Sequence, residues 1–414
     1  MINKDVAVLG AGIVGVATAL HLQTRGRDVA LIDRRGAGEE TSFGNAGIIE
    51  RATIYPYLFP RDWRKLAVYA VNGLNEARYN WRDLPGFAPF LWRYFIESAP
   101  RRALDHALSA RPLIEACLGE HEKLMRDAGA DHLLRKTGWL KLFRNEASFD
   151  EGRAAAEAIK PFGLNVAILD AQDVRRAEPA LRETVVGAVH YLDPASVSDP
   201  QALTLAYLRL FQERGGRFAQ GDARSLQADS DGYVVETAEG VLHAREVVLC
   251  LGPWSDLALA PFGYKIPLAV KRGYHRHFRP EEGASLSRPV LDADRGYLLA
   301  PMARGIRLTT GAEFARRDAK PDYTQIEKSE IFARQLVALG PRVEDEPWMG
   351  RRPCLPDMLP VLGAAPRHKG LWFNFGHQHH GLTLAAVCGR LLAEMMTGEK
   401  PFADPSPFSI ERFA

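Results

Sequence analysis

A glycine-rich turn near the start of the chain constrains the fold more than any other feature of the sequence. The apolar run Val6–Leu9 is typical of a buried strand. It leads into Gly10, Gly12 and Gly15 at G-x-G-x-x-G spacing. The first glycine permits a tight turn, the second lets the backbone approach a pyrophosphate, and the third lets the next helix pack closely on the strand. The apolar face of residues 13–24 predicts that helix, whose positive end would meet the phosphates.

An acidic residue at the end of the next predicted strand narrows the choice of dinucleotide. The run Val29–Ile32 ends at Asp33, about twenty residues beyond the glycines. A carboxylate there can accept hydrogen bonds from a ribose diol and disfavours a 2′-phosphate. A turn that binds no ligand is the alternative, but strand, glycines, helix, strand and acid occur in the order that a dinucleotide-binding fold requires. We therefore expect FAD or NAD rather than NADP.

The sequence after Asp33 favours FAD over NAD. A nicotinamide-binding domain would continue with alternating strands and helices, whereas here the polar loop TSFGNAG (41–47) and a long helical insertion follow. Thr41, Ser42 and Asn45 lie beside glycines in a loop that can present backbone donors to phosphate and flavin. An ordinary surface turn is the alternative interpretation of this loop.

The composition suits a soluble enzyme. Of 414 residues, 46% are hydrophobic and 25% charged, and the formal net charge is +2, so large cores can form and a nucleic-acid-binding face is not indicated. The four cysteines form no C-x-x-C pair, which favours a reducing compartment. The sequence has no leader pattern and no apolar run long enough to span a bilayer. We expect a cytoplasmic protein, with peripheral contact at the inner membrane face as an alternative.

The middle of the chain predicts an insertion and then a second crossover unit. Residues 55–130 are expected to form helices, with breaks at Pro85, Pro89, Pro100 and Pro112. Strand-like runs follow, and a helix is expected to begin at Pro200. The apolar run 247–251 leads into Gly252 and Trp254, where backbone can again approach the cofactor. Residues 261–314 predict a mostly antiparallel sheet, and a helix is expected near 324–340.

These patterns predict two interleaved domains of the α/β class. Segments 1–50, 196–258 and 345–414 are expected to form an FAD-binding dinucleotide fold around a central parallel sheet. Segments 51–195 and 259–344 are expected to form an α+β substrate-binding domain with a mostly antiparallel sheet.

Two dense motifs near the C-terminus carry the candidate chemistry. The first, WMGRRPCLPDMLPVLG (348–363), predicts a loop constrained by glycine and proline, in which Arg352 can present a planar fork to a carboxylate. The second, LWFNFGHQHHGLT (371–383), predicts a strand, a polar loop and then a helix from about Thr383 to Met396. The free N–H groups of that helix could stabilise negative charge on a flavin. Its loop contains His377, His379 and His380, but no acid or cysteine completes a ligand set, so we predict no metal.

The chain resembles the FAD-dependent amino acid oxidoreductases that include D-amino acid oxidase, glycine oxidase and sarcosine oxidase, and it is most similar to bacterial D-amino acid dehydrogenase. The N-terminal fingerprint, TSFGNAG, VVLCLGPWS, GRRPCLPDMLPVLG and GHQHHGLT occur in the family order over nearly the whole chain. The resemblance implies non-covalent FAD and a substrate carboxylate held by Arg352. It also implies that backbone of Gln378–His380 receives the amine, with Tyr274 assisting the carboxylate. We count Arg352, Tyr274, His379 and His380 as candidate catalytic residues.

The predicted cofactor contacts come from the same motifs. They are Gly10, Gly12, Ile13, Val14, Gly15, Asp33, Arg34, Thr41, Ser42, Asn45, Ala46, Gly47, Ala223, Gly252, Trp254, Gly350, Gly381, Leu382 and Thr383. The chain departs from its relatives in the bulky residues 378–380, which puts the usual side-chain preference in question. The spacing of Cys354 does not match the attachment cysteine of the sarcosine oxidases, so no covalent flavin is expected.

The expected reaction is oxidative deamination of amino acids, with D-amino acids as the expected substrates. Hydride transfer from the α carbon to flavin N5 would give an imino acid, and then a 2-oxo acid and ammonia. Oxidation of a secondary amine, such as D-proline, hydroxy-D-proline or sarcosine, is the alternative. A non-catalytic subunit of a hetero-oligomer and an RNA-modifying relative are disfavoured, because Arg352 is intact and no basic face is visible.

The electron acceptor is expected to be oxygen or a membrane quinone. Only one dinucleotide fingerprint occurs, which disfavours NAD as acceptor. The aromatic run FAPFLWRYF (87–95) offers a surface for lipid or a protein partner, although burial in a helical core is the favoured interpretation. The sequence does not indicate an oligomeric state.

Overall fold

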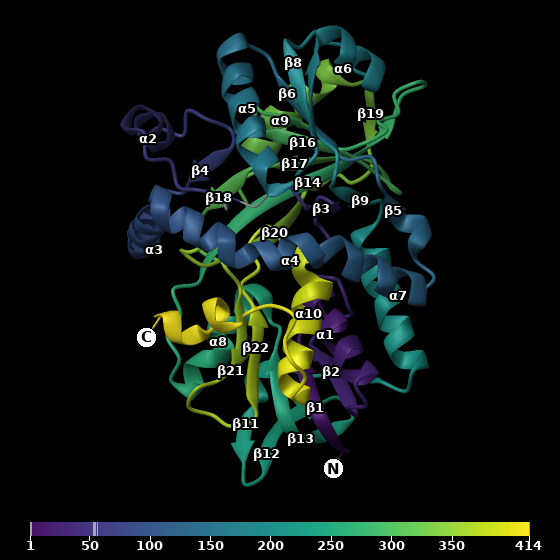
Figure 1. Cartoon of the computed structure of the whole chain (residues 1–414), viewed down its shortest axis with the longest axis vertical. Helices are drawn as coiled ribbons and strands as arrows, with labels where there is room; N and C mark the ends of the chain where they lie inside the picture. Colours follow the sequence, from purple (N-terminus) through teal and green to yellow (C-terminus); the bar gives the residue numbers. More distant parts are fainter. Residues whose placement is uncertain (1, 53–54, 56, 414) are drawn as a thin grey trace.

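Two large β-sheets organise the chain. In the computed structural model, which describes residues 2–52, 55 and 57–413, one sheet has eight strands and the other eleven. The smaller sheet lies in the lower half of Figure 1 and the larger in the upper half, with the long helix α4 (Pro100–Asp127) crossing between them. The described part of the chain does not include residues 1, 53–54, 56 and 414. All of them fall within the predicted domains, and residue 56 also falls within the predicted helical segment 55–130.

The eight-stranded sheet has a parallel centre. Its strands β10, β2, β1, β13 and β22 pair in parallel, and β12, β11 and β21 join them antiparallel. The strands are β1 (Ile2–Leu9), β2 (Val29–Asp33), β10 (Arg217–Gln220), β11 (Gln227–Asp229), β12 (Gly232–Thr237), β13 (Gly240–Leu249), β21 (Val361–Ala364) and β22 (Leu371–Phe375). Val6–Leu9 are fully buried because helices α1 (Ile13–Thr24), α7 (Pro200–Glu213), α10 (Gly381–Thr397) and α4 cover one face of the sheet and a second core covers the other. The predicted dinucleotide fold is confirmed.

The eleven-stranded sheet is mostly antiparallel, as predicted. Its strands are β4 (Ala77–Tyr79), β6 (Trp139–Phe143), β7 (Val166–Asp170), β8 (Gly187–Tyr191), β14 (Ala269–Pro280), β15 (Val290–Asp292), β16 (Tyr297–Met302), β17 (Gly305–Thr310), β18 (Ala312–Phe314), β19 (Leu339–Arg342) and β20 (Trp348–Cys354). The long strand β14 pairs with β17, β18, β19 and β20. Because side chains alternate along a strand, Lys271, Gly273 and His275 share one face of β14, and Arg272 and Tyr274 the other.

The remaining elements are short or lie over the sheets. Three short strands, β3 (Ile48–Ile49), β5 (Leu134–Arg135) and β9 (Ala195–Val197), form a third sheet. The other α-helices are α2 (Trp63–Ala70), α3 (Leu84–Glu97), α5 (Glu146–Ile159), α6 (Ala171–Ala177), α8 (Ser255–Leu259) and α9 (Thr324–Leu336). Short 3₁₀ turns span Asp131–Leu133, Lys160–Phe162, Ala223–Ser225, Gly252–Trp254, Ala260–Phe262, Ser406–Phe408 and Ile410–Phe413.

Two prolines do not break helices as predicted. Pro85 and Pro100 lie in the first turns of α3 and α4, but Pro89 and Pro112 lie inside these helices. Both internal prolines are exposed, so the carbonyl that each deprives of its hydrogen bond can face water. The predicted helical segment also contains the strand β4, which pairs in parallel with β18.

The predicted loop around Arg352 was wrong, because the residue lies on strand β20. Seven residues of this strand pair with β14, and Arg352 lies opposite Lys271. Strand β20 therefore belongs to the larger sheet, although the segment 345–414 was assigned to the FAD-binding domain. The domain boundaries stay a prediction.

Candidate active site

One cavity brings together residues that are far apart in the sequence. It has a volume of about 560 Å³ and is lined by residues of both large sheets. The predicted residues in its lining are Gly10, Gly12, Ile13, Val14, Asp33, Arg34, Thr41, Ser42, Asn45, Ala46, Ala223, Gly252, Trp254, Tyr274, Gly350, Arg352, His379, His380, Gly381, Leu382 and Thr383. The two other predicted residues, Gly15 and Gly47, lie outside this lining.

The glycine-rich turn opens the end of helix α1 to the cavity. Gly12 is the N-cap residue and has no side-chain cap, so backbone N–H groups of the first turn face the cavity. A Cβ atom at Gly15 would lie 1.8 Å from the carbonyl oxygen of Gly10, which explains why this position packs the helix against the strand and does not line the cavity. The N–H of Ile13 donates to Ser42 Oγ at 3.0 Å and joins the turn to the polar loop. This end of the cavity suits a pyrophosphate.

Asp33 lies at the same end of the cavity. Its Oδ2 accepts a hydrogen bond from the Ala11 N–H at 2.7 Å, and its Oδ1 accepts one from the Arg35 N–H at 3.0 Å. Burial raises the pKa of the Asp33 carboxyl, and these two hydrogen bonds oppose that rise. Each carboxylate oxygen retains a lone pair for a further donor, such as a ribose hydroxyl.

The polar loop 41–47 is tied to the larger sheet. Thr41 Oγ1 donates to the carbonyl of Arg351 at 2.9 Å, and Arg307 donates through Nη1 to the carbonyl oxygens of Phe43 and Asn45. Arg307 itself donates to His277 Nε2 at 2.9 Å, and His277 Nδ1 lies 2.7 Å from Glu344. The sequence analysis missed this chain of side chains, because its members lie on strands that meet the loop only in the folded protein.

Arg352 lies at the other end of the cavity. Its side chain lies across Gly273, where a Cβ atom would be 2.5 Å from Nη2. Nη1 donates to the carbonyls of Gly311 at 3.0 Å and Arg272 at 3.3 Å. Burial lowers the pKa of the guanidinium, which still stays charged at neutral pH. Among the described residues, Nε and Nη2 have no acceptor, so part of the fork can bind a ligand.

The loop between β22 and α10 packs beside Arg352. Gln378 adopts a left-handed backbone conformation (φ 57°), and its side-chain amide pairs with Leu355: Nε2 donates to the carbonyl at 3.3 Å and Oε1 accepts from the N–H at 3.2 Å. The bulky Gln378 therefore holds the loop against the end of β20. His380 is the N-cap of α10 and has no side-chain cap, which leaves the helix N–H groups open to the cavity.

The three histidines of this loop are neutral at physiological pH. Burial lowers the pKa of His377 to about 3, lowers that of His380 to about 4, and lowers that of His379 well below its usual value. The charges of Arg352 and Lys271 lower the pKa of His379 further. His377 Nε2 is buried and has no partner within the described part of the chain. The cavity wall therefore combines uncharged imidazoles with the Arg352 cation.

Tyr57, rather than Tyr274, has its ring beside the histidine loop. The Tyr274 hydroxyl donates to Glu313 and accepts from the Asp322 N–H at 3.0 Å, on the face of β14 opposite Gly273. Tyr57 has its ring centroid 4.9 Å from that of His379 and 6.1 Å from that of His380. Tyr57 lies in a segment without helix or strand, and no pattern in the sequence distinguishes it.

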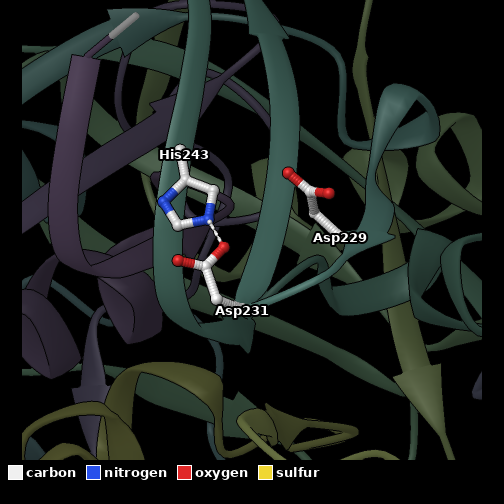
Figure 2. Close-up of side chains that lie close together, drawn as sticks. All are labelled: Asp229, Asp231 and His243. Carbon is white, nitrogen blue, oxygen red and sulfur yellow. Dashed lines mark hydrogen bonds and ion pairs between the residues drawn. The ribbon is translucent and has the colours of Figure 1, made fainter.

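A separate cluster of metal-type ligands lies outside the cavity. Asp229, Asp231 and His243 offer ligand atoms within 4.8 Å of one another, and His243 Nε2 lies 3.0 Å from the Asp231 carboxylate (Figure 2). Both aspartates are exposed, at the turn between β11 and β12. Exposed acidic groups of this kind are common without an ion, and none of the three lines the cavity.

The residues of the cavity fit a large polar ligand. Three buried polar atoms in its wall, His377 Nε2, Asn374 Oδ1 and Arg317 Nε, have no partner in the ranges that the structure describes. Buried polar groups are normally paired, so a ligand is expected to supply the missing partners. With the uncapped ends of α1 and α10, this donor set suits a dinucleotide between Asp33 and the histidine loop.

The glycine-rich turn, the acid at β2 and the arginine at the far end of one cavity form the arrangement expected of a dinucleotide-binding enzyme. A model of the family described as FAD dependent oxidoreductase matches residues 5–395, and the chain belongs to this family. It is 29% identical to a D-amino-acid oxidase of Bradyrhizobium diazoefficiens, over 99% of each chain. It is 30% identical to a D-amino acid dehydrogenase of Paramagnetospirillum magneticum, over 99% of this chain and 98% of the relative.

A solved structure has the same fold. Glycine oxidase from Geobacillus kaustophilus superimposes with a TM-score of 0.75 at 23% identity, over 99% of each chain. The family match shows that the protein is an FAD-dependent oxidoreductase. Among the helices that the structure describes, none has both the length and the apolar character needed to cross a membrane.

Proposed function

We propose that the protein catalyses the oxidative deamination of D-amino acids. The observation that carries the proposal is the position of Arg352, a buried guanidinium with part of its fork unpaired at the end of a cavity whose other end suits a pyrophosphate. A planar fork in a site of low water content is suited to bind the carboxylate of an amino acid. The similarity to a D-amino acid dehydrogenase and a D-amino-acid oxidase supports the D configuration.

Different groups of the cavity would bind the carboxylate and the amine of the substrate. Arg352 would hold the carboxylate, and backbone carbonyls of residues 378–380 would accept the N–H groups of the neutral amine. The neutral imidazoles of His379 and His380 add no charge that would repel the amine or its proton. Bound FAD would supply the two-electron acceptor, its N5 atom, for the hydride of the α carbon. Hydride and one amine proton leave, and water then converts the imino acid into a 2-oxo acid and ammonia.

We propose that FAD is bound without a covalent link. Gly10, Gly12 and Asp33 would hold the phosphates and the ribose, and the N-terminus of α10 would face the flavin. The cavity lining contains Cys250, whose pKa burial raises to about 12, so its thiol is a poor nucleophile. Acid precipitation should therefore release FAD into the supernatant. Flavin that stays with the precipitate would refute this part of the proposal.

We propose oxygen or a membrane quinone as the electron acceptor, with a peripheral membrane contact in the second case. In the aromatic run 87–95, Phe87, Phe90 and Tyr94 are buried, whereas Trp92 is 64% exposed. Trp92 stacks on Phe95, whose ring lies 4.1 Å from the Arg61 guanidinium. Exposed aromatic and basic side chains side by side suit the surface of an anionic bilayer. Co-sedimentation with anionic but not neutral vesicles is expected, and loss of this difference in Trp92→Ser would identify the contact.

A substrate screen tests the proposed function. The FAD-loaded protein is mixed with D- and L-amino acids, D-proline, hydroxy-D-proline and sarcosine, and reduction of an artificial dye is followed. Formation of a 2-oxo acid and ammonia from a primary D-amino acid is the expected result. Exclusive oxidation of a secondary amine would replace the proposal by the alternative reaction, and no reduction by any of these compounds would refute it.

A further inference from the structure

A second buried cation lies beside Arg352. Lys271 is only 3% exposed, and its Nζ lies 4.1 Å from the centroid of the Tyr94 ring, 5.4 Å from that of Phe314 and 5.8 Å from that of Phe90. The three rings stabilise an ammonium through their π faces. Over residues 2–52, 55 and 57–413, the Lys271 ammonium has no carboxylate partner. Buried lysines without a partner are uncommon, because burial of an unpaired charge is costly.

Lys271 and Arg352 lie on the same side of the sheet. They are directly opposite each other in the antiparallel pair of β14 and β20, so their side chains leave the sheet on one face. Gly273, two residues along this face, lines the cavity together with Arg352. Both cations act on His379, which also lines the cavity, since both charges lower its pKa. Lys271 therefore lies just behind the wall at the Arg352 end.

Among the side chains that the structure describes, none forms an ion pair with Lys271 or Arg352. Burial raises the pKa of the Cys354 thiol and of the Tyr94 phenol, so both are neutral at physiological pH. Glu50 also lines the cavity, and its charge raises the pKa of Tyr57. Its Oε1 accepts a hydrogen bond from the Ala52 N–H at 3.0 Å. Burial lowers the pKa of the Lys271 ammonium, and the charge of Arg352 lowers it further.

We infer that the substrate carries a second carboxylate, and that Lys271 binds it while Arg352 binds the α-carboxylate. The inference rests on the proposed function and narrows its substrate to acidic D-amino acids of the D-glutamate and D-aspartate type. One carboxylate leaves one of two adjacent buried cations unpaired, whereas two carboxylates neutralise both. The three rings lie around the Lys271 ammonium itself. The flexible four-carbon stem of the lysine lets this ammonium turn from the rings toward the cavity when a carboxylate binds there.

The test compares isosteric substrates on matched variants. Anaerobic reduction of the FAD-loaded protein is followed with D-glutamate and with its uncharged amide, D-glutamine. In wild type, D-glutamate should be preferred. Lys271→Met should raise the apparent Kd for D-glutamate by about 10- to 100-fold, the range expected for loss of a hydrogen bond to a charged group, and change that for D-glutamine by less than about threefold. The control Lys265→Met removes an exposed lysine shortly before β14 and should change neither.

The outcomes separate this inference from the proposed function. Equal use of D-glutamine and D-glutamate by wild type, or an equal loss for both in Lys271→Met, would overturn it while D-amino acid oxidation stands. If no D-amino acid reduces the flavin, the proposed function fails and this inference fails with it. A second measurement uses wild type alone, so that it does not depend on the folding of a variant. Glutarate, which has two carboxylates, should raise the Tm and perturb the flavin absorbance at lower concentration than butyrate, which has one. Equal effects of the two acids would also overturn the inference.

Discussion

Replacement of Arg352 should abolish most of the activity while the flavin stays bound. From β20, the side chain lies across Gly273 of β14, and among the residues that the structure describes only Nη1 has acceptors, the carbonyls of Gly311 and Arg272. Arg352→Ala removes the charge and the fork together. Arg352→Lys keeps a charge but replaces the planar fork by a single point donor, which loses the orientation of the substrate.

The size of the effect follows from burial. Removal of one partner from a buried ion pair costs about 3–5 kcal/mol, because the remaining charge is left uncompensated. In Arg352→Ala, the uncompensated group is the substrate carboxylate, so kcat/KM should fall by about two to three orders of magnitude or more. The carbonyls of Gly311 and Arg272 also lose a donor, which lowers the free energy of unfolding by about 1 kcal/mol for each bond. The variant should remain folded and yellow.

The neighbouring Arg351 provides the control. It lies on the opposite face of β20, and its Nε donates to the carbonyl of Arg317 at 3.0 Å. In anaerobic stopped-flow reduction of the flavin, Arg351→Ala should retain the wild-type rate within about threefold, as expected for a substitution away from the substrate. If Arg352→Ala reduces its flavin at the wild-type rate with unchanged substrate affinity, another residue binds the carboxylate and the proposed mechanism fails.

Three further predictions concern the cofactor and the core. In Gly15→Ala, the new methyl group would lie 1.8 Å from the Gly10 carbonyl and displace α1, so the protein should be isolated nearly free of flavin; normal flavin content would contradict this. Asp33→Ala should raise the Kd for FAD by about 10- to 100-fold and leave turnover of the loaded enzyme unchanged, and an unaltered Kd in fluorescence titration would remove Asp33 from the site. His121 is fully buried, and burial lowers its pKa to about 4. As the pH drops from 6.5 to 4, the imidazole therefore takes up a proton in the unfolded chain before it does so in the folded protein. This difference should lower the free energy of unfolding by about 3 kcal/mol. Urea unfolding of His121→Gln should show a smaller dependence on pH, and an identical dependence would exclude this histidine.

The geometry of the glycine-rich turn could be predicted because it is local in the sequence. Gly10, Gly12 and Gly15 act within one turn, and their spacing carries the geometry of strand, turn and helix. The same holds for the start of α10 after the histidine loop. In both places a helix end and its loop are adjacent in the chain, so no knowledge of distant contacts was needed.

The substrate end could not be predicted in the same way, because it depends on strand pairing. Arg352 was expected in a loop, since glycine and proline surround it, but pairing with β14 makes the segment a strand. Tyr274 was expected from the family resemblance, but alternation along β14 turns its side chain toward Glu313 and away from Gly273. The face of a strand that borders the cavity depends on how the two sheets meet.

Strand β14 carries two buried cations with different surroundings. Arg272 and Lys271 are adjacent in sequence, and both are buried. Arg272 pairs with Glu313 through Nη2 at 2.8 Å and Nε at 2.9 Å, so its charge is neutralised within the protein. Lys271 faces the other side, toward Arg352, and its ammonium lies among aromatic rings, without a carboxylate partner in the described part of the chain. In the sequence the two residues look alike. In the folded protein Glu313 neutralises the charge of Arg272, whereas Lys271 has no carboxylate partner among the described residues and lies behind the cavity wall. The inferred second negative charge of the substrate therefore rests on the structure and not on the sequence.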